Sequence, residues 1–220
     1  MGQRLIPSVT QIRDLRIIID ESLSFTPHIE HLRNQGTRKT YHLIKSLPKL
    51  SEELMTKLFC IYVRPSMEYG SEIFNPSGVN LSKLLEHPQK VFTRRLLYRP
   101  GAPRIPYADR IRHLSLDSLE FRRARTDLLM TYKILTGQID LNRLNFFQFP
   151  HRVNERKHHQ FTLQVPQIKK ERNFFPYRLI PTWNNLPKNE MNTILGLEQF
   201  RSFLDNAPKN LILPNSVFSY

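Results

Sequence analysis

Cysteine and glycine are both scarce in this chain of 220 residues. Cys60 is the single cysteine, which excludes an intramolecular disulfide and a zinc site built on cysteine ligands. With seven glycines, the chain has few candidates for a phosphate-cradling loop, and it contains no Walker, GxGxxG or GxSxG motif. No apolar run approaches the ~18 residues that cross a membrane, and the first ten residues lack the apolar core of a secretory signal. We therefore expect an intracellular protein, nuclear or cytoplasmic, with no membrane partner.

Paired carboxylates and clusters of metal ligands are missing as well. Two-metal chemistry requires carboxylates that converge on two divalent ions ~4 Å apart, and the sequence has no Asp-Asp pair. Glu52 and Glu53 are better explained by a favourable interaction with a helix N-terminus. The histidine pairs at 28/31 and 158/159 have no third ligand of suitable spacing, and Cys60 lies in an apolar stretch that favours a buried packing role. We expect no catalytic residue, no metal, no cofactor and no small-molecule substrate.

Positive charge is what the chain has in excess. Lys and Arg number 33 against 19 Asp and Glu, so the net charge is +14 and the isoelectric point is near 10.2. Such a balance is typical of proteins that bind nucleic acids, and the alternative is a basic surface without a partner. The basic residues gather in five clusters: Arg38-Lys39, Arg94-Arg95, Arg122-Arg123 with Arg125, Arg152 to Lys157, and Lys169-Lys170 with Arg172.

Arginine-rich clusters favour phosphate as the partner. Guanidinium groups bind phosphate oxygens bidentately, and the counterions released from the nucleic acid drive association. Interleaved aromatic residues can stack on unpaired bases; the candidates are Phe92, Tyr98, Phe174 and Phe175. For any one cluster, the alternative is a solvated helix face with its aromatic residues in the core. Five clusters together favour RNA, DNA or an RNA–DNA hybrid as the partner.

Hydrophobic periodicity predicts a mainly α-helical protein that begins with a short β-hairpin. Residues 15–20 alternate as a strand does, with Gly2 to Val9 as the expected partner strand and a loose turn over residues 10–14. Thr26 is the expected N-cap of a first helix, with Pro27 at its first position, and Pro48 ends this helix. Ser51 is the expected N-cap of the second helix, whose buried stripe would be Leu54, Leu58, Ile61 and Tyr62.

Prolines mark several boundaries in the rest of the chain. A third helix opens at Leu81 and continues to Leu97, with a kink or break at Pro88. The stretch from Tyr98 to Pro106 is typical of a linker. Regularly spaced apolar residues from Phe121 to Leu135 then predict a helix that ends at Gly137. Arg122, Arg123 and Lys133 would lie on its polar side. Residues 173–187 predict an irregular cap, residues 197–204 a short amphipathic helix, and residues from Pro208 a tail.

Five segments of the chain are informative in combination: VTQIRDLRIIIDESLSFTPHI (9–29), KLFCIYVRPSMEYGSEIFNP (57–76), KLLEHPQKVFTRRL (83–96), YADRIRHLSLDSLEFRRARTDLLMTYKILTG (107–137) and FFPYRLIPTWNNLP (174–187). In this order they resemble the C-terminal part of a non-LTR (LINE-type) retrotransposon reverse transcriptase. The second is similar to the signature Y-V-R-P-x-L-E-Y-G-S-x-x-W-x-P, with Phe74 in place of the usual Trp. Arg16 stands where the family usually has glycine, and Pro88 replaces an ordinary helix residue.

The resemblance implies a division of the chain into parts. Residues 1–24 would correspond to the end of the palm, with a hairpin that grips the primer terminus. Residues 25–98 would be the helical thumb-like bundle, residues 107–207 the post-thumb region, helical and irregular, and residues 208–220 a tail. The family's Asp-Asp metal site would lie before Met1, so we expect an RNA-directed DNA polymerase fragment that is not an enzyme by itself.

On this interpretation the chain keeps a sequence-independent binding of template–primer duplex through phosphate contacts. The residues expected to make these contacts are Arg33, Arg38, Lys39, Arg94, Arg95, Arg122, Arg123 and Arg125. Two alternatives stay open. One is a protein-interaction module that uses helical faces left by the missing palm, with possible self-association. The other is part of an active reverse transcriptase whose reading frame extends upstream.

Overall fold

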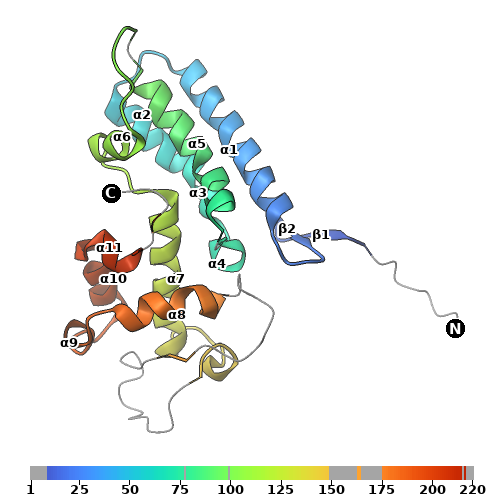
Figure 1. The fold of residues 1–220 in the computed structure, drawn as a ribbon, viewed down its shortest axis with the longest axis vertical. Coiled ribbons are helices and arrows are strands. Elements are labelled where there is room, and N and C mark those ends of the chain that lie inside the picture. Colours follow the sequence, from blue (N-terminus) through green and yellow to red (C-terminus); the bar gives the residue numbers. More distant parts are fainter. Residues whose placement is uncertain are drawn as a thin grey trace, which may run out of the picture.

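A computed structural model of the chain describes residues 9–76, 78–98, 100–148, 163–164, 175–214 and 216. The protein is mainly α-helical, with a short two-stranded N-terminal hairpin followed by helices and irregular segments, as the sequence predicted (Figure 1). The strands are β1 (Gln11–Asp14) and β2 (Ile17–Asp20). The first helices are α1 (Thr26–Ser46), α2 (Glu52–Leu58), the π-helical segment η1 (Phe59–Val63), α3 (Arg64–Glu68), α4 (Ser71–Phe74) and α5 (Val79–Leu96). The later ones are α6 (Tyr107–His113), α7 (Leu119–Leu135), the 3-10 segment η2 (Arg143–Asn145), α8 (Phe175–Asn185), α9 (Lys188–Met191), α10 (Leu197–Asn206) and α11 (Lys209–Ile212).

The hairpin is tighter than the sequence predicted. β1 and β2 pair antiparallel with Asp14 opposite Ile17, so Leu15 and Arg16 alone form the turn, at φ values of 42° and 69°. Two residues with positive φ suit the right-handed twist of a hairpin, but the usual Asn-Gly signal is absent here. The expected partner strand was therefore placed wrongly, and its residues 2–8 lie outside the part of the chain that the structure describes.

The carboxylate of Asp20 fixes the start of α1. It accepts hydrogen bonds from the backbone N–H groups of Phe25, at 2.7 Å, and Ser24, at 3.1 Å. Burial alone would raise the pKa of Asp20. The hydrogen bonds from Ser22, Ser24 and Phe25 outweigh this effect and lower the pKa from 3.8 to about 2. The N-cap of α1 is Phe25 in a left-handed conformation, one residue before the predicted Thr26.

Helices α1 and α5 lie side by side and form the spine of the upper part in Figure 1. They approach closely at Gly36, where an added Cβ would lie 2.9 Å from Pro88 Cγ and 2.5 Å from Met67 Sδ. Pro88 is buried in this contact, and α5 runs unbroken from Val79 to Leu96. Of the predicted kink or break at Pro88, the break is therefore wrong, because the proline packs closely against α1 at Gly36 within a continuous helix.

The buried stripe after Ser51 differs from the predicted one. Ser51 caps α2 through a hydrogen bond from Leu54 N, as predicted. However, the buried side chains are Met55, Phe59, Val63 and Met67, four residues apart, while Ile61 is 73% exposed. The π-helical segment η1 widens the turn, so residues four apart stay on one face. A stripe predicted on α-helical spacing was therefore wrong.

The C-terminal elements form a core of their own around α7. Residues from α7, α8, α9, α10 and α11 share one apolar cluster that includes Tyr132, Trp183 and Phe200. Gly137 ends α7 with φ 71° and α10 follows Gly196, both as predicted. The expected irregular cap is instead the helix α8, with Pro181 inside it. The expected tail includes α11, whose Ile212 is fully buried.

Candidate nucleic-acid interface

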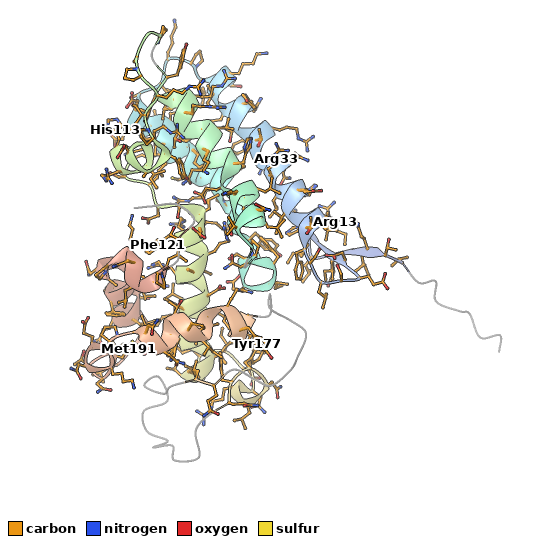
Figure 2. All side chains as sticks on the ribbon, viewed as in Figure 1. Arg13, Arg33, His113, Phe121, Tyr177 and Met191 are labelled. Atoms are coloured by element: carbon orange, nitrogen blue, oxygen red, sulfur yellow. The ribbon has the colours of Figure 1, made fainter. Side chains whose placement is uncertain are left out.

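Four basic side chains line one face of α5. Lys83, His87, Lys90 and Arg94 follow each other at intervals of four, three and four residues, which places them on one side of a helix. Lys83 and Arg94 are exposed, while His87 and Lys90 are partly buried. Arg110 from α6 and Arg33 from α1 extend this row on its two flanks, and Figure 2 labels Arg33 on α1. We call these six residues the basic ridge.

The charges of the basic ridge repel one another. Burial lowers the pKa of His87, and the positive charges of Arg33, Arg94 and Lys90 lower it further. Burial also lowers the pKa of Lys90, with Lys83 and Arg110 acting in the same direction against the attraction of Glu86 and Glu120. Burial and then Arg94 lower the pKa of Arg110, against the Tyr107 hydroxyl. Three separate elements thus bring their cations into one field, which a polyanion would neutralise.

Few carboxylates neutralise the ridge from inside the protein. Within the described residues, Lys83, His87 and Arg94 form no ion pair. Arg110 is held by uncharged groups, because its Nε donates to Thr93 Oγ1 at 3.1 Å and its Nη1 to the Ile105 carbonyl at 3.2 Å. Charge that protein carboxylates leave unbalanced is available to phosphate.

The other predicted residues of the helical bundle lie around the ridge. The Arg95 guanidinium lies 5.2 Å from the ring centre of Tyr41, which places it between α5 and α1. Arg38 is exposed on α1. Lys39 points to a different neighbour, since its Nζ lies 5.3 Å from the ring centre of Tyr62 in η1. Arg33, Arg94 and Arg95 therefore flank the α1–α5 contact, whereas Lys39 lies on the side of η1.

The three arginines predicted on α7 are engaged within the protein. Arg122 forms a bidentate ion pair with Glu68, and Arg125 Nη2 lies 2.6 Å from Asp205 Oδ1. Arg123 is 1% exposed and donates from Nε to Asn75 Oδ1 at 3.0 Å. A sequence pattern cannot separate such buried arginines from surface ones, since both recur at helical spacing. Arg123 does not reach the surface, so the interface described here leaves it out.

Buried polar groups connect helices that lie far apart in the sequence. The fully buried Glu86 of α5 accepts hydrogen bonds from the backbone N–H groups of Leu119 and Glu120 at the start of α7. Burial is the largest effect on its pKa, which is raised. Arg178 of α8 donates to Asp127 of α7 and to the backbone carbonyls of residues 71 and 72. These contacts hold α4, α5, α7 and α8 together.

Four residues of the basic ridge were not among the predicted contacts. They are Lys83, His87, Lys90 and Arg110. The spacing of the first three with Arg94 is visible in the sequence, but isolated basic residues do not form a cluster when only neighbours along the chain are compared. Two predicted clusters, at 152–157 and 169–172, and the histidines at 158/159 lie outside the described residues.

The described part of the chain contains no group of three or more His, Cys, Asp or Glu side chains placed to hold a metal ion. Burial raises the pKa of the Cys60 thiol, which keeps it protonated. Among the helices built from these residues, none combines the length and the apolar character that crossing a bilayer requires.

Comparison with known proteins finds a relative in a nematode. Over 128 residues the chain is 33% identical to an uncharacterized protein of Caenorhabditis elegans. The match covers 58% of this chain and 65% of the worm protein, so the chain spans less than two thirds of that relative's length. No family model matches the chain, and no solved structure matches it.

Proposed function

We propose that this protein binds the phosphate backbone of a nucleic-acid duplex through the basic ridge, without reading its sequence. The gathering of the cations Arg33, Lys83, Lys90, Arg94 and Arg110 from α1, α5 and α6 into one positive field carries the proposal. Phosphates that bind beside these cations neutralise the field, and contacts to phosphate carry no sequence information. The α5 part from Lys83 to Arg94 spans about 16 Å at the helical rise per residue, which corresponds to about five phosphates of one strand.

We further propose that the chain corresponds to the thumb and post-thumb part of a non-LTR retrotransposon reverse transcriptase, without its catalytic palm. The interlocking of the motif segments supports this proposal: Glu68 pairs with Arg122, and Asp127 with Arg178. Arg16, where the family usually has glycine, has a left-handed backbone with φ 69°, a conformation that glycine adopts at no cost. Polymerisation would then belong to the palm, and duplex binding to this chain.

The test is a fluorescence-anisotropy titration of the purified chain with a labelled, blunt RNA–DNA duplex at several salt concentrations. We expect saturable binding whose log affinity falls linearly with log salt, with a slope near −0.9 for each phosphate engaged. A second duplex of the same length and unrelated sequence should bind with nearly the same affinity. A chain that is folded and helical yet shows no binding at low salt would refute the proposal.

Charge reversal locates the interface. The double variant Lys83→Glu with Arg94→Glu replaces two exposed cations of the ridge and should reduce the salt slope by about two. The matched control is Lys188→Glu with Arg201→Glu, which makes the same change of net charge at exposed positions on α9 and α10. Equal losses of affinity in the two variants would mean that net charge alone, and not the ridge, attracts the duplex.

A second candidate function is self-association through an apolar surface. Ile61, Tyr69 and Ile73, from η1 to α4, are 73%, 55% and 52% exposed. Exposed apolar groups mark an interaction surface when they form a contiguous patch. Light scattering over a range of protein concentrations distinguishes the two functions: a particle mass that rises with concentration, and falls in Ile61→Lys, would favour self-association.

A further inference from the structure

A pocket opens where the basic ridge ends. It has a volume of about 690 Å³ and lies between the C-terminal end of α5, α1 and the segment before α6. Its lining includes four arginines, Arg94, Arg95, Arg104 and Arg110, together with apolar and aromatic groups, and the described lining contains no acidic side chain. This volume is within the range of about 300–1,000 Å³ that small-molecule ligands occupy.

The pocket combines two kinds of surface. Tyr98 and Ile105, on its rim, are 66% and 43% exposed, and Ile44 and Leu97 add apolar area. An aromatic or aliphatic face of this kind accommodates a planar base. The arginines supply forked donors suited to phosphate oxygens. Arg110 is positioned for this role by its bonds to Thr93 and to the Ile105 carbonyl.

The pocket continues the line of the ridge. Arg94 belongs to both, because it is the last member of the α5 row and also lines the pocket. If the phosphates of a nucleic-acid strand bind Lys83, His87 and Lys90 in turn, the following nucleotide of that strand lies at the pocket. A paired base cannot enter, since pairing keeps it stacked inside the duplex.

We propose that the pocket holds one unpaired nucleotide of a strand that extends beyond the duplex on the ridge. The arginines bind its phosphate, and its base lies against Tyr98 and Ile105. The preferred ligand is then a junction between duplex and single strand. This inference rests on the proposed duplex binding, and a free mononucleotide has the same chemistry, so the test separates these sources.

The ligands for the test are a blunt RNA–DNA duplex, the same duplex with a two-nucleotide overhang at each strand end in turn, the overhang with abasic sugars, and a free nucleoside monophosphate. We expect one of the overhangs to bind about tenfold more tightly than the blunt duplex, because stacking one base on an aromatic side chain contributes on this scale. The abasic overhang should lose most of this gain. With 2-aminopurine in the overhang, its fluorescence should change on binding.

Two variants place the effect in the pocket. Tyr98→Ala removes the aromatic face, and Ile105→Ala removes most of the aliphatic face at an exposed position of the lining. Both should abolish the overhang gain and leave binding of the blunt duplex within about twofold, as expected for loss of base stacking alone. The control is Tyr69→Ala, another exposed tyrosine, between α3 and α4, which should keep the gain.

The outcomes separate the two proposals. If the blunt duplex binds and no overhang improves its affinity, the pocket assignment fails and the ridge proposal stands. If the free nucleoside monophosphate binds as tightly as the duplex with the overhang, the pocket is a site for free nucleotides and the junction proposal is overturned. If the folded chain binds no duplex, both proposals fail.

Discussion

Arg178 of α8 and Asp127 of α7 form a bidentate ion pair inside the protein, with Nε 2.7 Å from Oδ2 and Nη2 2.9 Å from Oδ1. Both side chains are almost completely buried, at 8% and 4% exposure. The same guanidinium donates to the backbone carbonyl of Glu72 in α4. One side chain from the C-terminal core thus reaches α7 and the N-terminal bundle together.

Loss of this arginine should destabilise the protein strongly. Arg178→Met leaves the Asp127 carboxylate buried without its cation, and the removal of one partner of such a pair costs about 3–5 kcal/mol. Urea unfolding followed by circular dichroism measures the change. In a double-mutant cycle, Asp127→Asn combined with Arg178→Met should cost less than the sum of the single changes. Strict additivity would show that the two side chains act independently.

Gly36 should tolerate no side chain. Gly36→Ala places a Cβ 2.5 Å from Met67 Sδ and 2.9 Å from Pro88 Cγ, so α1 and α5 must move apart or Met67 must shift, at a cost of about 1–3 kcal/mol. The control is Gly196→Ser, since a Cβ there meets no atom within 4 Å and serine is a good N-cap. Thermal unfolding should show a lower midpoint for the first variant only. An unchanged midpoint would contradict the close helix contact.

His28 should make the fold sensitive to mild acid. Its Nδ1 accepts a hydrogen bond from the Ile18 N–H at 3.3 Å, and its ring packs edge-on against Phe74. Burial, followed by the charges of His31 and Arg13, lowers its pKa from 6.5 to about 4. The unfolded chain thus takes up the proton first as pH falls, so the unfolding free energy declines between pH 6.5 and 4, by roughly 3 kcal/mol at most.

The measurement is the urea midpoint at pH 7.5 and at pH 4.5. His28→Gln, which keeps an acceptor for Ile18 but does not titrate, should lose less stability on acidification than the unaltered protein. His42→Gln removes an exposed histidine and serves as the reference. Equal acid sensitivity of all three proteins would exclude His28 as the source.

His87 should couple nucleic-acid binding to pH. Its pKa is lowered by burial and by the cations Arg33, Arg94 and Lys90, and a bound phosphate would raise it again. Binding therefore takes up a proton, and affinity should increase as pH falls below the ordinary imidazole range, with at most about one log unit per pH unit. Titrations of the duplex at pH 7.5 and pH 5.5 measure this effect. His87→Asn should abolish the difference; a difference of the same size in the variant would place the proton elsewhere.

Arg16 should be replaceable by glycine with a gain in stability. Its φ of 69° places it in the left-handed region, which costs a residue with a side chain about 1–2 kcal/mol. Arg16→Gly removes this strain and should raise the unfolding midpoint, while Arg13→Gly, in the middle of β1, should lower it. A lower midpoint for Arg16→Gly would mean that the arginine side chain stabilises the hairpin through contacts.

Local signals were sufficient for most of the fold. Ser51 lies before the second helix, Gly137 ends α7, and the apolar spacing of residues 197–204 predicted α10, because each signal depends on residues within one helical turn. The errors have tertiary causes. Pro88 does not break α5, since it packs against Gly36, and the stripe after Ser51 is displaced because η1 is π-helical.

The candidate site, like the fold, could be predicted from the sequence only in part. The sequence by itself determined that the chain is helical and strongly basic, because charge and periodicity are properties of residues near one another in the chain. It did not determine which arginines face outward. Arg94 and Arg123 belong to similar Arg-Arg pairs, yet Arg94 is exposed and Arg123 is fully buried beside Asn75. Only the tertiary structure decided this, since burial depends on which helices pack together, and the packing of α1, α5 and α6 also gathers the cations of the basic ridge.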